Sequence, residues 1–356
     1  MPSTPVKLIT SGLSLDNWDS LTIKRSIDEF ADAFSFSCQS SAGLRAKLKP
    51  RGYQPAEVWF GNEKLITGQI EKHSGAVASA ELNFEGRSKT GPMVDCNITQ
   101  RNIQVSGMTL LSVAEFFSLQ GITCIAPKGD SPKLAYFVTA SNTDTMAAFL
   151  QKLAKTQTKF IFHSDPEGRL VLDQPALRGA PTVKIVEGQG IFLDASVSVD
   201  GTQLFSQYHV VNSTGGFIAA ADGHDTLDRV DKGIKVFRPK YLDVSSGAAS
   251  QIQDAATQAV ALGISGAVSI EVILGDWTSN DGTLFAPGQF LELTAPSVWI
   301  EQPFTLMVAS VTMTLSGGDG RKSSLRCVIP GTYSGVIPTV WPWDADSSPY
   351  SRGFNK

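Results

Sequence analysis

The sequence contains little cysteine, no long apolar run and no excess of positive charge, and each absence excludes a class of protein. Its 356 residues carry a formal net charge of −4, which argues against a broad basic face that grips nucleic acid. Nowhere does the chain reach the roughly 18 consecutive apolar residues of a membrane-spanning helix, so we expect no stable membrane insertion. The start, Met1 to Lys7, lacks an apolar signal segment, and we expect synthesis and retention in a cytoplasm.

The cysteines are widely spaced and never form a Cys-x-x-Cys pair: they are Cys38, Cys96, Cys124 and Cys327. This spacing excludes a zinc ribbon and a dithiol redox motif. Each cysteine lies in an apolar or strand-like context, so we expect buried free thiols.

Catalytic motifs are also missing. No Gly-x-Ser-x-Gly elbow or local cysteine signature accompanies the histidines, and the Gly-rich segments lack the Lys-Ser/Thr of a phosphate loop. Asp222-Gly223-His224-Asp225 offers metal-binding side chains, but no spacing supplies a further ligand, and a solvated turn is favoured. We therefore predict no catalytic, cofactor-binding or metal-binding residues.

The composition is that of a globular protein, with 42% apolar and 18% charged residues, and the length favours two to four domains. The clearest pattern lies between Glu57 and Cys96. Ile66, Gly68 and Ile70 alternate with polar residues, and Leu82 and Phe84 do the same after a Gly-containing link, 73–79. A period of two predicts a half-buried antiparallel hairpin. We interpret 86–90 as a polar exit from the sheet.

A weaker copy of this pattern lies near the other end of the chain. Val298-Trp299-Ile300 echoes Val58-Trp59-Phe60, and a Gly-rich turn at 317–320 is followed by a strand from Leu325 to Ile329. The offset between the copies is nearly constant. This suggests two related β-domains in one chain.

Further strands are predicted at 6–9, 21–27 and 34–38, which is enough for one antiparallel barrel or sandwich, and at 183–185, 195–199, 208–211 and 268–272. A hairpin is predicted at 160–172, around the turn 165–168.

Three helices are also predicted. One carries Leu110, Val113, Ala114 and Phe117 after an N-cap at Thr109. A second runs from Met146 to Ala154 after a cap at Asn142 or Thr143. The third is Ala-rich, runs from Gln251 to Leu262 with Ile252, Ala255, Ala259 and Leu262 along one side, and stops at Gly263.

Two segments carry a family resemblance. Ile23-Lys24-Arg25-Ser26-Ile27-Asp28-Glu29 through Phe34-Ser35-Phe36, and Gly86-Arg87-Ser88-Lys89-Thr90 to Val94-Asp95-Cys96, resemble the central baseplate hub protein of Mu-like contractile phages. This is the tail protein D or phage late control family, which is related to the hub domains of type VI secretion spikes. Ser88 stands where the family usually has Asp. The resemblance is weaker from Ser213 to Gly282 and in the tail.

The resemblance implies an α+β, mainly β fold with two related antiparallel tube-like β-barrel domains, a peripheral α+β domain and a C-terminal tail. The ranges expected are 1–97 for the first barrel, 98–178 and 213–284 for the peripheral domain, 179–212 and 285–330 for the second barrel, and 331–356 for the C-terminal extension.

The resemblance also implies a function: a homotrimeric hub in the virion tail baseplate, assembled in the host bacterial cytoplasm. The implied partners are the membrane-piercing tail spike, the tail tube and other baseplate proteins. DNA would pass through without specific binding, because many Lys or Arg contacts to phosphate would hold it. We therefore expect more Asp and Glu than Lys and Arg in the lumen. The family has no catalytic residue to carry over.

The apolar C-terminal tail contains Trp341 and Trp343 without periodicity, and we predict that these residues dock on a partner or a neighbouring subunit.

Alternatives remain open. A close variant is the hub of a type VI secretion spike or a phage-tail-like bacteriocin. A tail-associated polysaccharide or peptidoglycan hydrolase would use Asp276 or Glu57 in an acid pair, and a carbohydrate-binding module would expose Trp277 in a shallow groove. The other candidate carboxylates are Glu71, Glu81, Glu85 and Asp281. The first three occupy outward positions of an alternating sheet, where a charged side chain needs no special explanation.

Overall fold

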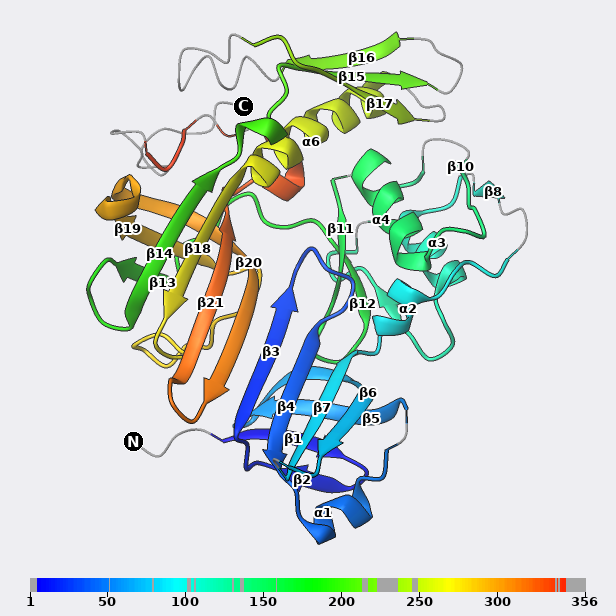
Figure 1. Cartoon of the computed structure of the whole chain (residues 1–356). Coiled ribbons are helices and arrows are strands. Elements are labelled where there is room, and N and C mark those ends of the chain that lie inside the picture. The colour runs from blue at the N-terminus through cyan, green and yellow to red at the C-terminus, as the bar shows by residue number, and fades with distance from the viewer. Residues whose placement is uncertain are drawn as a thin grey trace.

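Strands dominate the structure, a computed structural model (Figure 1). It describes residues 5–343 except 51, 79, 101–103, 106, 130, 135–137, 158, 213–216, 223–235, 245–248, 337 and 339. No helix in these ranges is long and apolar enough to cross a membrane.

The described strands and helices follow in chain order. The strands are β1 (Val6–Thr10), β2 (Leu13–Leu15), β3 (Ser20–Ser26), β4 (Ala33–Gln39), β5 (Gln54–Phe60), β6 (Glu63–Ala76), β7 (Glu81–Ser88), β8 (Gln104–Val105), β9 (Cys124–Ile125), β10 (Val138–Thr139), β11 (Ile161–Ser164), β12 (Leu170–Asp173), β13 (Val183–Val186), β14 (Phe192–Val199), β15 (Gln207–Asn212), β16 (Phe217–Asp222), β17 (Pro239–Val244), β18 (Val268–Leu274), β19 (Phe290–Ala295), β20 (Ile300–Ser316) and β21 (Gly320–Val328). The helices are α1 (Ala42–Lys47), α2 (Gly91–Asp95), α3 (Leu110–Phe117), α4 (Met146–Gln157) and α6 (Ala249–Ala267), with 3₁₀ turns η1 (Gly201–Gln203), η2 (Pro296–Val298) and η3 (Thr332–Ser334).

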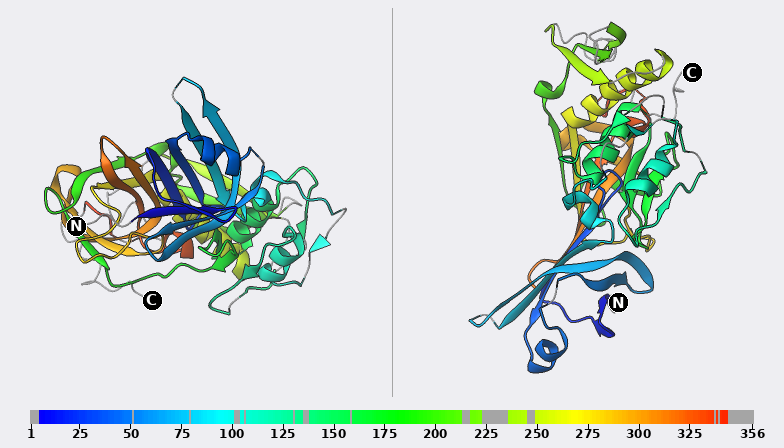
Figure 2. Two further views of the ribbon diagram at one scale, coloured as in Figure 1. Left: turned by 90° about the horizontal axis from the view of Figure 1, so that it is seen from below. Right: turned by 90° about the vertical axis from the view of Figure 1, so that its right-hand side faces the viewer.

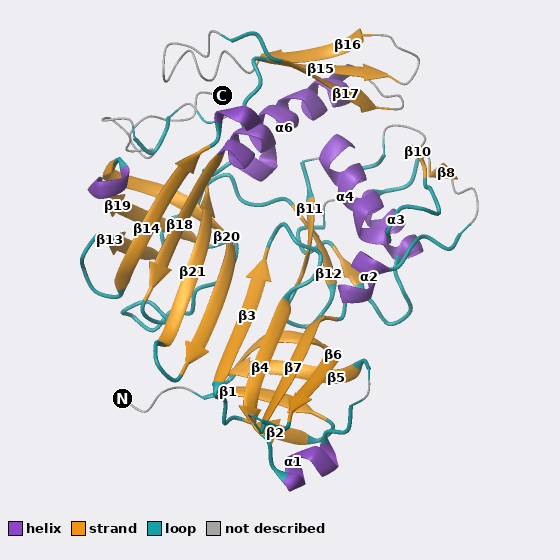
Figure 3. Cartoon of the chain, in the orientation of Figure 1, coloured by secondary structure: helices purple, strands orange, loops and turns teal. Residues whose placement is uncertain are grey.

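A 13-stranded sheet organises the molecule, in the order β14-β18-β21-β20-β3-β4-β7-β6-β5-β1-β2, with β19 pairing with β20 and with β13 (Figure 3). Strands β1 to β7 form the first barrel, and β13, β14 and β18 to β21 form the second. The barrels meet where β20 pairs antiparallel with β3, from Ser310 opposite Ser26 to Ser316 opposite Ser20. Their buried side chains form one continuous cluster.

The two barrels repeat the same strand register. In the first, Ile70 lies opposite Gly86 and a bulge follows before Lys72 pairs with Glu85. In the second, Val308 lies opposite Cys327 and a bulge follows before Ser310 pairs with Arg326. β6 and β7 are therefore the counterparts of β20 and β21.

The inner strands repeat as well. Leu21 of β3 lies opposite Phe36 of β4, which in turn faces Phe84 of β7. Ala195 of β14 lies opposite Val272 of β18, which faces Leu325 of β21. So β3 and β4 correspond to β14 and β18. The fold contains two related barrels, as the sequence suggested, but the matching residues differ from the sequence echo: the counterpart of β5 is β19, not residues 298–300.

The strands predicted in the first barrel are confirmed. Phe34 and Phe36 are buried, as their alternation with serine indicated. The hairpin turn is shorter than expected, however. Backbone pairing continues to Ala76 opposite Glu81, so residues 73–76 belong to β6, because strand pairing requires no apolar period at an exposed tip. The short helix α1, with Ser41 as its N-cap, was not predicted.

A peripheral α+β body contains α2 to α4 and β8 to β12, around a core that includes Phe117 and Phe149. Thr109 caps α3 as predicted. The predicted caps of α4 are wrong: Thr145 Oγ1 accepts the hydrogen bond from the Ala148 N–H. The Asn142 side chain instead donates to the backbone carbonyl oxygens of Ile98 and Gln100.

Helix α6 and the sheet β16-β15-β17 cover the other end of the second barrel (Figure 1). The helix continues through Gly263, contrary to expectation. A Cβ there would lie 2.1 Å from the Tyr208 hydroxyl oxygen, so this glycine permits close packing rather than ending the helix. Of the predicted stripe, Ala259 and Leu262 are half-buried and pack against the cores, whereas the side chains of Ile252 and Ala255 lie outside the described part. The fully buried apolar residues of the helix are Ala256, Val260, Ala261, Ile264 and Ala267.

Two expected domain assignments are wrong in detail. β18 falls within 213–284 but lies in the main sheet between β14 and β21. β15 falls within 179–212 but pairs with β16 and β17. A strand pattern shows that a segment pairs, but it does not name the partner. One cysteine also departs from expectation: Cys96 is exposed, whereas the other three are buried free thiols.

Gly86 provides a test of the packing inside the first barrel. A Cβ at this position would lie 2.2 Å from the Gln69 carbonyl oxygen and 2.4 Å from the Phe34 ring. Gly86→Ala should therefore lower the free energy of unfolding by about 1–3 kcal/mol in urea titrations. Gly43→Ala in α1, where nothing lies within 4 Å, is the matched control and should be neutral or slightly stabilising. Equal effects at both positions would contradict the packing described.

Candidate functional site

The loop between β3 and β4, residues 27–32, lies where the two barrels and the peripheral body meet. Ile27 packs in a cluster with Phe290 and Val328 of the second barrel. Phe30 packs in the core of the peripheral body, with its ring centroid 5.4 Å from that of Phe162. We call residues 27–32 the junction loop. Its two large apolar side chains, Ile27 and Phe30, point into two different cores.

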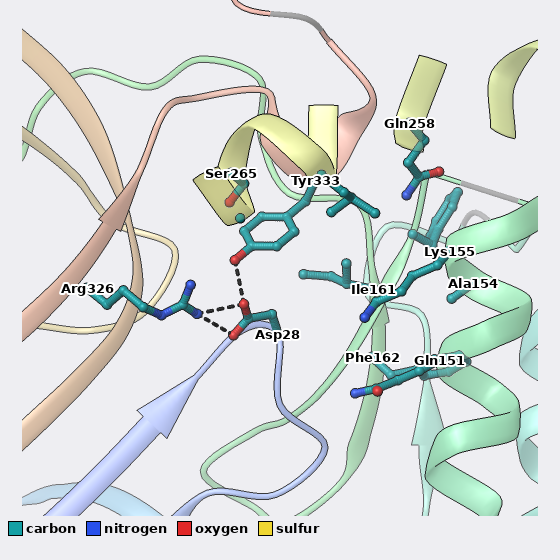
Figure 4. Close-up of a pocket in the computed structure, with 13 residues that line it drawn as sticks. Asp28, Gln151, Ala154, Lys155, Ile161, Phe162, Gln258, Ser265, Arg326 and Tyr333 are labelled. Carbon is teal, nitrogen blue, oxygen red and sulfur yellow. Dashed lines mark hydrogen bonds and ion pairs between the residues drawn. The ribbon is translucent and has the colours of Figure 1, made fainter. Parts of the chain in front are cut away.

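Asp28 of the junction loop forms the polar link to the second barrel and to the segment after it. Arg326 Nη2 lies 2.6 Å from both carboxylate oxygens, and the Tyr333 hydroxyl donates to Oδ2 at 2.6 Å (Figure 4). Ser26 Oγ donates to the same carboxylate at 2.5 Å. Burial alone would raise the pKa of Asp28, but the Arg326 charge and these hydrogen bonds lower it below its usual value.

Asp32 closes the other end of the loop. Its Oδ1 accepts from the Ser26 N–H at 3.0 Å, and its own N–H donates to Ser88 Oγ at 3.1 Å. The Thr90 hydroxyl donates to the Phe30 carbonyl oxygen at 2.6 Å. The strand β7 ends at Ser88, within the predicted exit 86–90, but Ser88 and Thr90 do not face solvent. Ser88 and Thr90 are fully buried and hold the junction loop in place.

Asp32 is 2% exposed, and burial raises its pKa to about 7, against the opposing charge of Arg25 and the hydrogen bond from the Ser26 N–H. Arg25 Nε lies 3.8 Å from Oδ2, beyond hydrogen-bonding distance.

A cavity of about 280 Å³ adjoins the Asp28 cluster, between α4, α6 and β11. Arg326, Tyr333, Lys155 and Gln258 are among its lining side chains (Figure 4). Gln258 is 1% exposed, and its Nε2 has no hydrogen-bond partner among the described residues.

The cavity offers hydrogen-bond donors but no nucleophile paired with a base. Within the described ranges, no group of three His, Cys, Asp or Glu side chains could hold a metal ion. The contacts of the junction loop hold the two barrels and the peripheral body together. The sequence did not predict these contacts, although both motifs that carry the family resemblance contribute residues to them.

The predicted docking residues are packed on the main core. Trp341 is 1% exposed and stacks on Trp343, with ring centroids 5.2 Å apart, and Trp343 is half-buried. Docking of a partner at these residues stays a prediction.

The carbohydrate-binding interpretation is wrong at its central residue. Trp277 is fully buried, and its indole N–H donates to the carbonyl oxygens of Thr314 and Lys322 at 3.0 and 3.1 Å. Its ring packs against Phe60, 5.5 Å between centroids, with the Arg321 guanidinium over both rings. Local sequence alone does not distinguish an exposed tryptophan from one that is buried between two barrels.

The candidate acids have structural partners. Glu57 accepts from the Trp59 indole and pairs with Lys64, and Asp276 accepts from the backbone N–H of Trp277. The others are Glu71 with Arg87, Glu85 with Lys72, Glu81 with Ser37, and Asp281 with Ser279. Residues 223–225 of the Asp222–Asp225 turn lie outside the described residues.

Comparison with known proteins gives a consistent result. Residues 5–88 match the family described as "Mu phage baseplate assembly protein GpP-like, N-terminal". No curated protein matches the sequence. The fold is similar to that of the 43 kDa tail protein of prophage MuSo2 from Shewanella oneidensis, with a TM-score of 0.75, 20% identity, and coverage of 94% of this chain and 100% of that one.

Two further solved structures share the fold. A tail protein from Neisseria meningitidis has a TM-score of 0.78 and 19% identity, with 94% of this chain and 99% of that chain covered. The E. coli c3393 protein, a type VI secretion component described as similar to the T4 tail proteins gp27 and gp5, has a TM-score of 0.54 and 12% identity, with 93% and 79% covered. The predicted fold class and the resemblance to Mu-like baseplate proteins are confirmed.

The Asp28–Arg326 pair can be tested by a double-mutant cycle. Asp28→Asn and Arg326→Met should couple by about 1–2 kcal/mol in the free energy of unfolding, a value kept modest because the Arg326 side chain is 39% exposed. The exposed pair Lys322–Asp319 is the matched control and should couple by about 0.5 kcal/mol or less. Since the pKa of Asp28 is lowered, the coupling should be lost as pH falls below 3.8. Additive effects of the two substitutions at pH 7 would contradict the link.

The raised pKa of Asp32 predicts a pH dependence of the free energy of unfolding opposite to that predicted for Asp28. Its native pKa of about 7 exceeds the ordinary 3.8, so its contribution to stability is fully present below that value and declines as pH rises to about 7. Urea unfolding of the wild type and of Asp32→Asn should show the wild type losing stability relative to the variant, by at most about 1.4 kcal/mol per pH unit. A difference that stays constant from pH 4 to 8 would show that Asp32 is ionised throughout.

Proposed function

From the premise that residues 5–88 form a domain of the Mu phage baseplate GpP-like family, we propose that the chain is a structural protein of a contractile phage tail, the trimeric central hub of its baseplate. One observation carries the proposal: a single chain holds two barrels of matching strand register, joined edge to edge. Three such chains would present six similar barrels. That arrangement reconciles a threefold hub with a sixfold tail tube.

The peripheral body and the α6 end of the second barrel would lie away from the conduit. Phe30, Ser88 and Thr90 tie the peripheral body to the first barrel, and Asp28 with Arg326 ties the barrels to each other. A hub of this kind transmits force between tube and spike, so its parts must move together. The junction loop supplies that rigidity.

The hub would bind the membrane-piercing spike on one side and the tail tube, with other baseplate proteins, on the other. In the virion the ring would form part of the DNA conduit, after assembly in the host cytoplasm. The net charge of −4 supports a lumen that passes phosphates without holding them. Partner docking at the C-terminal extension would use Trp343, because Trp341 is buried.

The alternative, a tail-associated polysaccharide or peptidoglycan hydrolase, has no support from the side chains proposed for it. Glu57 and Asp276 are occupied by the structural contacts described above, and Trp277 is sealed inside the molecule.

Light scattering coupled to size-exclusion chromatography tests the proposal. At micromolar concentration the protein should have three times the 38.1 kDa mass of one chain. A stable monomer would contradict a preformed ring, and a dimer would contradict the threefold symmetry.

A further inference from the structure

The joint between the barrels shows how one barrel edge receives another. In its second half, β20 pairs with β21 along one edge and with β3 along the other. Across the β3 joint, Val311 lies opposite Arg25 and Met313 opposite Ile23. The joint therefore consists of the long hairpin strand of the second barrel and the strand β3 of the first.

The counterparts of these two strands have open edges. β6 corresponds to β20, and beyond Ile70, where its pairing with β5 ends at Gln54, it pairs only with β7 in the described part of the chain. β14 corresponds to β3, and among the described residues it pairs only with β18. The β6–β7 hairpin projects from the first barrel (Figure 2), and β14 borders the opposite end of the sheet (Figure 3).

We propose that the outer part of β6 in one protomer pairs antiparallel with β14 of the next protomer, in the register that β20 and β3 use within the chain. This interface rests on the proposed ring and specifies its contact between chains. An edge strand with open N–H and C=O groups invites pairing, and pairing with a second copy would satisfy the open edges of β6 and β14.

The internal repeat fixes the register. His73 faces Phe84 as Val311 faces Leu325, so His73 is the counterpart of Val311. Val197 faces Ile270 as Ile23 faces Phe34, so Val199 is the counterpart of Arg25. The pairs across the interface are Lys72 with Asp200, His73 with Val199, Ser74 with Ser198, Gly75 with Val197, and Ala76 with Ser196.

These pairs are chemically compatible. Lys72 meets Asp200, an opposite-charge pair of the kind that stabilises neighbouring strands. No like charges oppose each other, and the remaining residues are small or apolar except His73. A shift by one residue would turn each apolar side chain to the other face.

Burial supports the same contact. Leu21 and Ile23 of β3, which the joint covers, are 3% and 0% exposed. Their counterparts Ala195 and Val197 on β14 are half-buried, and Val199 is 51% exposed. Pairing with β6 would cover them as β20 covers β3.

The tip of the hairpin fits as well. Val77, which follows β6, corresponds to Leu315, whose side chain packs against the shared core. In the single chain Val77 is 101% exposed. The proposed interface places it beside Ala195 of the next protomer.

Disulfide trapping tests the register. In a Cys96→Ser background, which removes the exposed thiol, protein carrying Ser74→Cys is mixed with protein carrying Ser198→Cys and oxidised. The two positions lie directly opposite in the proposed pairing, within reach of a disulfide. Non-reducing gels should show a covalent dimer of chains. Each protein carries only one of the two introduced cysteines, so a disulfide between positions 74 and 198 must join two chains.

The matched control replaces Ser198→Cys with Asp194→Cys. This position lies four residues along β14, about 13 Å away, and a disulfide to residue 74 should not form. Equal cross-linking in both mixtures would overturn the register.

The mass of the same reduced proteins separates this inference from the ring itself. A trimer by light scattering without the 74–198 cross-link would leave the ring standing and overturn this interface. A monomer without the cross-link would overturn both. A trimer with the cross-link only in the matched pair is the expected result.

Discussion

The antiparallel pairing of β3 with β20 is the constraint on which the rest of the structure depends. It turns two barrels into one sheet and gives them a common core, so neither barrel can rotate without breaking backbone hydrogen bonds. It also brings the junction loop, which follows β3, beside Arg326 and Tyr333. The polar cluster, the cavity and the packing of Phe30 in the peripheral body all follow from that placement.

Much of the fold could be predicted from local periodicity. The alternation of Phe34 and Phe36 with Ser35 and Ser37, and the turn residues before Leu170, indicated strands that the structure contains. Two kinds of error have a common cause. Gly263 was expected to end a helix, and β18 was expected outside the main sheet, because both outcomes depend on distant partners. Local sequence contains no information about the hydroxyl of Tyr208, which requires a glycine beside it.

The junction was harder to predict than the strands. Ser88 and Thr90 fall in the segment interpreted as a polar exit from the sheet, where a polar side chain usually faces water, and the local sequence indicated no contact for Asp28. Ser88 and Thr90 are buried and Asp28 is half-buried because three bodies converge on one loop, and each finds a hydrogen-bond partner there. Trp277 shows the converse: its aromatic ring suggested an exposed platform, yet it fills the contact between Phe60 and Arg321. The identity of a side chain set the chemistry available, and the topology set its use.

The distance in sequence between β3 and its partner has a consequence for biosynthesis. Ser26 Oγ donates to the carbonyl oxygen of Ala309, 283 residues away. The first barrel therefore leaves the ribosome with the edge of β3 unpaired. This strand can pair with β20 only after nearly the whole chain has been synthesised. Contacts so distant make folding slow, and open strands promote aggregation of nascent chains. We expect productive folding to be largely post-translational, with the closing of this seam as its late step.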